Sequence, residues 1–295
     1  KLKRLFSIIK QFNISNDIEF TMEANVENLT LDKIKLMKEN NVNRVSLGVQ
    51  TFDSNNLKYL NRLHNKSDVF NTIKLLKEND INNINIDLIY GIDEDINKVK
   101  KDIDLFLELD IPHLSCYSLI IEDHTILNNM NRLYINEDIE YEMYKYIEKS
   151  LEDNNYIHYE ISNYAKDGYY SKHNLTYWNN QDYIGFGLGS VSYINGNRIT
   201  NTKSITKYLD NKYMLSNIHE DIKEQQDNEL MLGFRKLKGI NLTKFKNKYN
   251  DNLENIYDVE KLLKDNYLIK ENDYLRINKE YIYISDEILL EINRK

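Results

Sequence analysis

The sequence predicts an α/β protein in which parallel strands form a partial barrel, followed by a smaller α+β module. Strand-like and helix-like segments alternate over the first two-thirds of the 295 residues, a pattern typical of right-handed β–α–β units. Apolar and polar residues alternate along each strand segment, so one face of the strand is apolar and the other is polar. Near the C-terminus a helical segment precedes a hairpin pattern, which predicts the separate α+β module.

The elements are predicted from apolar residues at three- and four-residue spacing for helices and from period-two alternation for strands. In chain order they are a helix at 2–12, a strand at 19–25, a helix at 30–37, a strand at 44–50, a helix at 67–76, a strand at 83–91, a helix at 96–107 and a strand at 113–121. Thr30 is expected to cap the second helix, since a hydroxyl can accept from the free N–H groups of a first turn, and Ser67 is expected to open the third.

The remaining third of the sequence differs in composition. The segments 158–165 and 172–190 are rich in aromatic residues, histidine and glycine and are expected to form loops and short strands. A helical pattern begins near Asp221, an Asn-Asp turn divides the strands of 267–284, and Ser285 is expected to cap a final helix. The expected domains are 1–160 for the partial barrel, 161–220 for a connecting segment and 221–295 for a winged-helix-like domain.

The polar face of the predicted strands indicates a ligand site. A parallel strand that is covered on both faces is apolar almost throughout. Here Glu23, Gln50 and Asp87 lie on the polar faces of three successive predicted strands. We expect this face to line a barrel lumen that holds a polar ligand. An open sheet with one face in water is the alternative that the pattern leaves open.

Composition excludes several functions. The net charge is −8, with acidic and basic residues interspersed, so a nucleic-acid binder is not expected. No apolar run approaches the roughly 18 residues of a membrane span, which predicts a soluble protein. The single cysteine, Cys116, excludes an internal disulfide, fits a reducing cytoplasm and is assigned to packing with Leu114 on the helix-facing side of its strand. The scattered histidines, including His124, have no metal-site spacing.

Several motifs follow one another in a fixed order. They are EFTMEAN (19–25), NRVSLGVQTFDSNNLKYLNRLH (43–64), NINIDLIYG (83–91), HLSCYSLIIEDHT (113–125), YEISNYA (159–165), KHNLTYW (172–178), GFGLGS (185–190) and ELMLGFRKLKGI (229–240). Together they resemble the radical S-adenosylmethionine family that contains oxygen-independent coproporphyrinogen III oxidase and the haem chaperone HemW. The resemblance implies a partial (β/α)6 radical S-adenosylmethionine barrel with a closing winged-helix-like domain. Val26 and Asp93 depart from it, because the family usually has proline there.

The resemblance implies an S-adenosylmethionine site formed by Glu23, Gln50, Arg62 and Asp87. Carboxylates can accept hydrogen bonds from ribose hydroxyls or an ammonium group, and Arg62 can pair with the methionyl carboxylate. Ligands of such barrels lie at the carboxyl ends of the strands. An ordinary ion-pair network among Glu23, Arg62 and Asp87 is the alternative.

The family also implies a 4Fe-4S cluster that this sequence cannot hold. Its members begin with a CxxxCxxC loop and a glycine-rich GGTP segment, and Lys1 corresponds to a position just after them. We therefore expect the N-terminal segment with the first strands to be missing. A cluster needs about three or four sulfur ligands, and Cys116 is the one cysteine present. No catalytic residue is assigned, and whether the chain is an enzyme stays open.

The segment KHNLTYW resembles the HNxxYW motif of the chaperone branch, which implies haem binding by His173, Asn174, Tyr177 and Trp178. Histidine can ligate haem iron, and aromatic rings offer faces to a porphyrin. A packing motif, in which His173 and Asn174 bond to backbone and the rings fill a core, is the alternative.

These features favour a cytoplasmic haem chaperone of the HemW type that passes haem to an acceptor protein. Peripheral association with a membrane stays open. Two other hypotheses remain: an oxygen-independent coproporphyrinogen III oxidase, and a truncated, non-catalytic remnant of the family with reduced solubility.

Overall fold

The computed structural model describes residues 1–121 and 135–295, which divide into two compact units, Lys1–Tyr170 and Ser171–Lys295. The end of the predicted motif at 113–125, with His124, lies outside the described residues. Among the helices of the described ranges, none has the length and apolar character that crossing a membrane requires.

The first unit is built on a six-stranded sheet of order β1-β2-β3-β4-β6-β5. The strands are β1 (Thr21–Asn25), β2 (Arg44–Gln50), β3 (Asn83–Tyr90), β4 (His113–Ser118), β5 (Ile157–Glu160) and β6 (Asn163–Ala165). Strands β1 to β4 are parallel, as the alternation predicts, whereas β6 runs antiparallel to both β4 and β5. The sheet therefore ends in an antiparallel hairpin instead of a further β–α unit.

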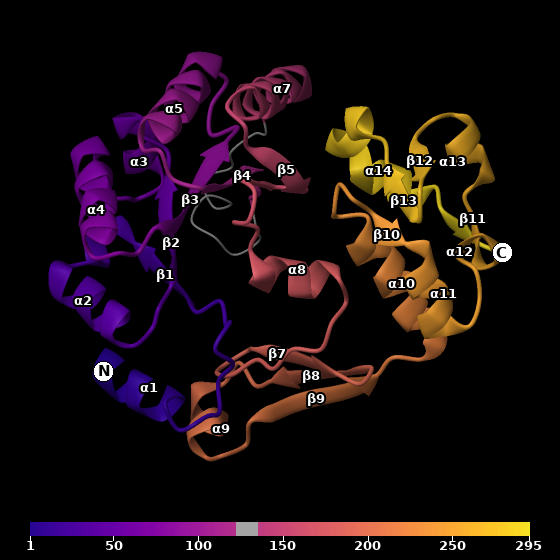
Figure 1. Ribbon diagram of the computed structural model, residues 1–295, viewed down its shortest axis with the longest axis horizontal. Coiled ribbons are helices and arrows are strands. Elements are labelled where there is room, and N and C mark those ends of the chain that lie inside the picture. Colours follow the sequence, from indigo (N-terminus) through magenta and orange to yellow (C-terminus); the bar gives the residue numbers. More distant parts are fainter. Residues whose placement is uncertain (122–134) are drawn as a thin grey trace. The chain divides into compact units, whose positions relative to one another are not determined.

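Helices cover the apolar face of this sheet. They are α1 (Leu2–Ile9), α2 (Leu31–Glu39), α3 (Ser54–Tyr59), α4 (Lys66–Glu78), α5 (Ile96–Glu108) and α7 (Glu137–Asp153), with a 3-10 turn η1 (Val26–Asn28). Figure 1 shows α2, α4, α5 and α7 along the outer side of the strands. Val45, Leu47 and Val49 of β2 are fully buried, and their apolar parity forms the core beneath these helices.

The second unit begins with a short helix and an antiparallel sheet. Helix α8 (Lys172–Trp178) is followed by β7 (Val191–Ile194), β8 (Asn197–Asn201), α9 (Ile205–Leu209) and β9 (Met214–His219). The prediction of loops and short strands over 172–190 is wrong at its start, because KHNLTYW is helical. The Ser171 side chain caps α8 by accepting a bond from the Asn174 N–H, so a local capping bond forms a helix too short to show a clear apolar period.

The rest of the second unit has its own apolar core, which includes Leu230, Phe245 and Leu275. Its elements are α10 (Ile222–Gly233), β10 (Ile240–Asn241), α11 (Leu242–Tyr249), α12 (Leu253–Ile256), β11 (Tyr257–Asp258), α13 (Glu260–Lys264), β12 (Leu268–Glu271), β13 (Tyr274–Ile277), η2 (Lys279–Ile284), α14 (Ser285–Leu290) and β14 (Asn293–Arg294). Helices precede a hairpin that turns at Asn272-Asp273, as predicted, and β10 completes a three-stranded sheet.

The predicted helix caps are wrong in detail. Helix α4 begins at Lys66, one residue before the predicted Ser67, and its cap is Asn65, which forms a reciprocal capping box with Asp68. Thr30 occupies the position before α2 without a side-chain bond, and Ser285 lies inside α14. The Asn65 side chain accepts from the Asp68 N–H and the Asp68 carboxylate accepts from the Asn65 N–H, so the box satisfies two N–H groups at once.

A buried carboxylate joins helix α5 to the end of β2. The carboxylate of Asp102 accepts bonds from the Thr51 hydroxyl at 2.7 Å and the Phe52 N–H at 2.8 Å. Burial raises the pKa of Asp102 to about 6, and nearby Asp53 adds to the rise, against the two hydrogen bonds. The carboxyl group of Asp102 therefore stays protonated in the folded protein over a pH range in which it is already ionised in the unfolded chain.

We expect the contribution of Asp102 to stability to fall as pH rises from the ordinary value of 3.8 towards 6. The quantity to follow is the free energy of unfolding of the unchanged protein minus that of Asp102→Asn. This difference should fall by up to about 3 kcal/mol over this pH range, since one pKa unit corresponds to about 1.4 kcal/mol. Urea unfolding at several pH values measures it, with exposed Asp104→Asn as the control. A constant difference between the protein and D102N would contradict the prediction.

Candidate functional site

Polar side chains from three parallel strands meet in one pocket of about 280 Å³ in the first unit. It is lined by Glu23, Ser46, Gly48, Gln50, Arg62 and Asp87, among others. The strand register explains the meeting, because Glu23 lies beside Ser46 and Gly48 lies beside Asp87. The four residues predicted from the sequence, Glu23, Gln50, Arg62 and Asp87, are thus brought together. The predicted site did not include Asn25, Ser46 and Gly48, which also line the pocket.

Gln50 has a strained backbone at the carboxyl end of β2. Its φ is 71°, in the left-handed region, and the β2–β3 register shifts at this point. The side chain is buried, and among the described residues its Oε1 atom has no hydrogen-bond partner. A residue held in such a conformation, with an unsatisfied buried acceptor in a polar pocket, indicates a functional position.

Gly48 keeps the pocket open. A Cβ atom built at this position would lie 2.8 Å from the Gln50 amide nitrogen and 3.3 Å from Asn25 Oδ1. The first distance is shorter than a Cβ contact tolerates, so any other residue would push the amide group of the Gln50 side chain aside. The space beside Gly48 therefore belongs to the pocket.

The loop that carries Arg62 is fixed by Glu27. Arg62 donates to Asn25 Oδ1 at 2.8 Å, while Glu27 accepts from the Leu63 N–H at 3.1 Å and contacts His64 Nδ1 at 3.0 Å. Partial burial opposes ionisation of Glu27, but the bonds from His64, its own backbone and Leu63 prevail and lower its pKa to about 2. An ionised Glu27 thus holds the loop at neutral pH.

Asp87 is the buried carboxylate of the pocket. Burial raises its pKa, and the nearby charge of Glu23 adds to the rise, against hydrogen bonds from Ser115 and Asn85. Asn85 donates to Asp87 Oδ1 at 2.8 Å. A carboxylate in this state gains from a cationic or hydrogen-bond-donating ligand.

Helix α8 presents the HNxxYW residues in two adjacent rows, because residues four apart lie on the same side of a helix. His173 and Tyr177 form one row, with ring centroids 4.9 Å apart in an edge-to-face contact. Asn174 and Trp178 form the other. The indole N–H of Trp178 is buried and has no hydrogen-bond partner among the described residues. His173 is exposed.

No cluster site is present among the described residues. They contain no group of three or more histidine, cysteine, aspartate or glutamate side chains that could hold a metal ion. Cys116 is buried beside the helix layer, and burial, together with the charge of Asp102, raises the pKa of its thiol. With no group of three ligating side chains among the described residues, this buried thiol is a packing group.

The fold and the polar pocket define the class of the protein. The Radical SAM superfamily profile matches residues 1–106, and the HemN C-terminal domain profile matches residues 223–280. Coproporphyrinogen III oxidase (HemN) from Escherichia coli, a radical SAM enzyme, superposes with a TM-score of 0.82 at 14% identity, over 98% of this chain and 73% of that one. The predicted radical SAM fold is therefore confirmed.

Sequence comparison then identifies the family. The chain is 39% identical to the heme chaperone HemW of Lactococcus lactis, over 94% of this chain and 76% of that protein. It is 35% identical to HemW of Bacillus subtilis, over 97% of this chain and 78% of that protein. The chain belongs to the HemW family of radical SAM proteins.

The strain at Gln50 can be measured by comparing two substitutions. Gln50→Gly and Gln50→Ala both remove the side chain, but only glycine adopts φ near 71° without steric cost. We expect Q50G to be more stable than Q50A by about 1 kcal/mol in urea unfolding, the cost of a left-handed conformation for an L-residue. The order should reverse at Gln11, which has no left-handed backbone. Equal stability of the two Gln50 variants would contradict the strain.

Proposed function

We propose that this protein is a haem chaperone that binds haem at helix α8 and S-adenosylmethionine at the polar pocket of the first unit. The observation that carries the haem assignment is the arrangement of His173, Tyr177 and Trp178 on α8. An exposed histidine stands one turn from a tyrosine ring, beside an indole N–H without a partner among the described residues. Such a helix offers an iron ligand, aromatic faces and a hydrogen-bond donor to a porphyrin.

The residues of the polar pocket fit S-adenosylmethionine. Gln50 has an unsatisfied buried acceptor, and the space beside Gly48 would be filled by any Cβ atom. Asp87 and Glu23 would accept bonds from the ribose hydroxyls or the ammonium group, and Arg62 would pair with the methionyl carboxylate. Two carboxylates also favour a ligand that carries a sulfonium charge.

The radical chemistry of the class lies outside what these residues support. Bound S-adenosylmethionine supplies a 5′-deoxyadenosyl radical when a reduced 4Fe-4S cluster cleaves it. The described residues do not fit such a cluster, because the single cysteine is buried and no cluster-sized group of ligands is present among them. The role proposed for the pocket residues is to bind and orient the cofactor.

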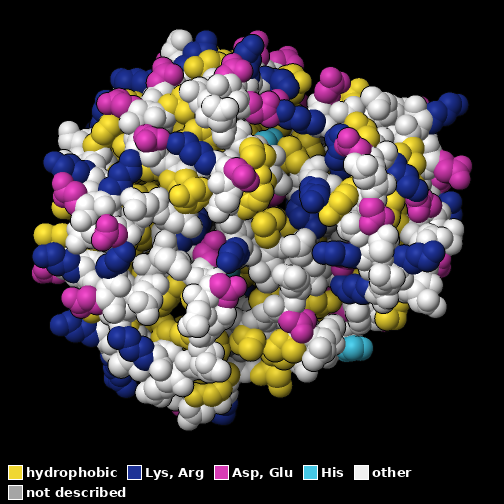
Figure 2. Space-filling view, in the orientation of Figure 1, with side chains coloured by type: hydrophobic (Ala, Val, Ile, Leu, Met, Phe, Trp, Pro, Cys, Tyr) yellow, Lys and Arg dark blue, Asp and Glu magenta, His cyan; other side chains and the backbone are white. Residues whose placement is uncertain are grey.

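The partner would be a protein that accepts haem in the cytoplasm. The names of the relatives from L. lactis and B. subtilis describe them as heme chaperones, and His173 is exposed where an acceptor could reach the iron. Nucleic acid is not a proposed partner. On the face seen in Figure 2 acidic and basic side chains are interspersed, without a broad basic area, and the net charge is −8.

Binding of S-adenosylmethionine should depend on the charge of Asp87. We expect Asp87→Asn to weaken binding about ten- to a hundredfold, since a hydrogen bond to a charged group contributes roughly 1.5–3 kcal/mol. The pKa of Asp87 is raised above its ordinary value of 3.8, so Asp87 begins to take up a proton while the pH is still above 3.8. The affinity should therefore fall as the solution is acidified towards that pH, and D87N should remove most of this pH dependence. Equilibrium dialysis measures both, with exposed Asp32→Asn as the control. Unchanged affinity in D87N would contradict this site.

Haem binding should depend on His173 and Trp178. We expect His173→Ala to weaken haem binding roughly tenfold, equivalent to about 1.4 kcal/mol, and to shift the Soret band, because the iron loses a ligand. Trp178→Phe keeps an aromatic face but loses the N–H, so a smaller loss is expected. Haem titration followed by absorbance tests both, with exposed His219→Ala as the control. Unchanged spectra and affinities in both variants would refute the haem site.

A second outcome separates the chaperone from the oxidase. A form of the protein that holds a reconstituted cluster would be incubated without oxygen with coproporphyrinogen III and S-adenosylmethionine. Clear formation of decarboxylated product would favour the oxidase. Haem binding without that product supports the chaperone.

A further inference from the structure

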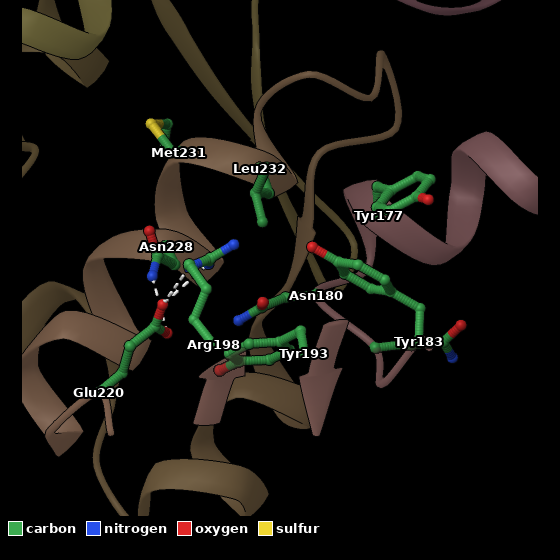
Figure 3. A pocket seen from close by; sticks show the side chains of 10 residues that line it. Tyr177, Asn180, Tyr183, Tyr193, Arg198, Glu220, Asn228, Met231 and Leu232 are labelled. Atoms are coloured by element: carbon green, nitrogen blue, oxygen red, sulfur yellow. Dashed lines mark hydrogen bonds and ion pairs between the residues drawn. The ribbon is translucent and has the colours of Figure 1, made fainter. Parts of the chain in front are cut away.

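A second pocket lies wholly within the second unit. Its volume is about 310 Å³, near the lower end of the range for ligand sites. Figure 3 shows tyrosine rings and the side chains of α10 around a group of charged and polar residues. Tyr177 of the HNxxYW helix is one of the lining residues, so this pocket adjoins the proposed haem-binding helix.

The walls of the pocket are flat and held in place. Tyr183 and Tyr193 exchange two backbone hydrogen bonds, of 2.8 and 2.9 Å, which attach the segment before β7 to that strand. The ring of Tyr183 meets the ring of Tyr177 edge to face at 4.6 Å. Met231 and Leu232 of α10 add apolar surface. Such walls suit a planar, largely apolar ligand.

Arg198 is the one cation among the residues that line this pocket. Its Nε and Nη2 atoms both lie 2.8 Å from Glu220 Oε1, and the guanidinium lies over the Tyr193 ring, 5.2 Å from the centroid. Asn228 donates to the other oxygen of Glu220 at 2.9 Å, and Figure 3 draws these bonds. Glu220 is thereby satisfied at both oxygens and orients the guanidinium.

Donors remain on Arg198 for a ligand. A guanidinium carries five N–H donors, and the contacts with Glu220 and Tyr183 use only some of them. The Arg198 side chain is 37% exposed, whereas that of Glu220 is 8% exposed, so a ligand reaches the cation and not the carboxylate. The amide groups of Asn180 and Gln181 also line the pocket. The lining therefore favours a carboxylate, which guanidinium binds with directed hydrogen bonds.

We propose that this pocket binds a propionate carboxylate of haem through Arg198, with the porphyrin edge against Tyr177 and Tyr183. This proposal rests on the proposed haem function and names the part of haem that the pocket recognises. His173 precedes Tyr177 by one helical turn. A porphyrin whose edge lies on the Tyr177 ring therefore has its iron on the side of the helix that carries the histidine.

A pair of ligands tests this without a variant. Haem and its dimethyl ester share the iron and the macrocycle, but the ester has no carboxylates. The full chain should bind haem roughly tenfold more tightly than the ester, because a hydrogen-bonded ion pair is lost. Arg198→Gln should lower haem affinity to that of the ester and leave ester binding unchanged. Arg198→Lys should recover part of the preference through charge alone.

The outcomes separate the two proposals. Arg276→Gln is the matched control, because Arg276 pairs with Glu271 in the hairpin and does not line this pocket; it should keep the full preference for haem. Equal binding of haem and ester by the unchanged protein, or a preference that survives in R198Q, overturns the propionate site while the haem function stands. Failure of the unchanged protein to bind either compound overturns the haem function itself, and the propionate site with it.

Discussion

The polar pocket of the first unit depends on Asn85, a buried residue that joins strands β2, β3 and β4. Its amide nitrogen, which has two N–H donors, lies within hydrogen-bonding distance of three acceptors: Ser46 at 2.8 Å, Asp87 at 2.8 Å and Ser115 at 3.0 Å. Its amide oxygen lies 2.6 Å from His113 Nδ1. Buried polar groups are as a rule hydrogen-bonded, and Asn85 links side chains of the three strands across the middle of the sheet.

His113 extends this network to Tyr159 of β5. It is fully buried, and burial, with the charge of Arg44 adding to the effect, holds its pKa well below the usual value. The ring is therefore neutral, with one donor and one acceptor nitrogen. Because Nδ1 faces the amide oxygen of Asn85, Nδ1 carries the proton and Nε2 accepts from the Tyr159 hydroxyl at 2.8 Å.

The strained end of β2 depends on a second buried group. Strained backbone persists only where its surroundings determine it, and directly after Gln50 the chain is held by the bonds of Thr51 and Phe52 to Asp102. The pocket is therefore supported from both faces of the sheet. Asn85 acts on the polar side, and Asp102 acts from the helix side.

The fold and much of the polar pocket could be predicted because alternation with a period of two assigns each strand residue to a face. Glu23, Gln50 and Asp87 follow from that alternation together with the family motifs. The backbone of Gln50 could not be predicted, since a left-handed glutamine arises from the register shift between β2 and β3. The helix at KHNLTYW was missed, because one serine cap and seven residues carry too weak a periodic signal.

The sequence by itself determined the family, the two-sided strands and the HNxxYW residues, all of which are properties of neighbouring positions along the chain. Only the tertiary structure decided which distant residues share a pocket. Arg198 comes from β8, Glu220 directly precedes the N-cap of α10 and Asn228 lies within that helix, and no spacing in the sequence relates the three. Their meeting results from the packing of apolar surface around them, which is not directional and leaves no pattern in the residues that it brings together.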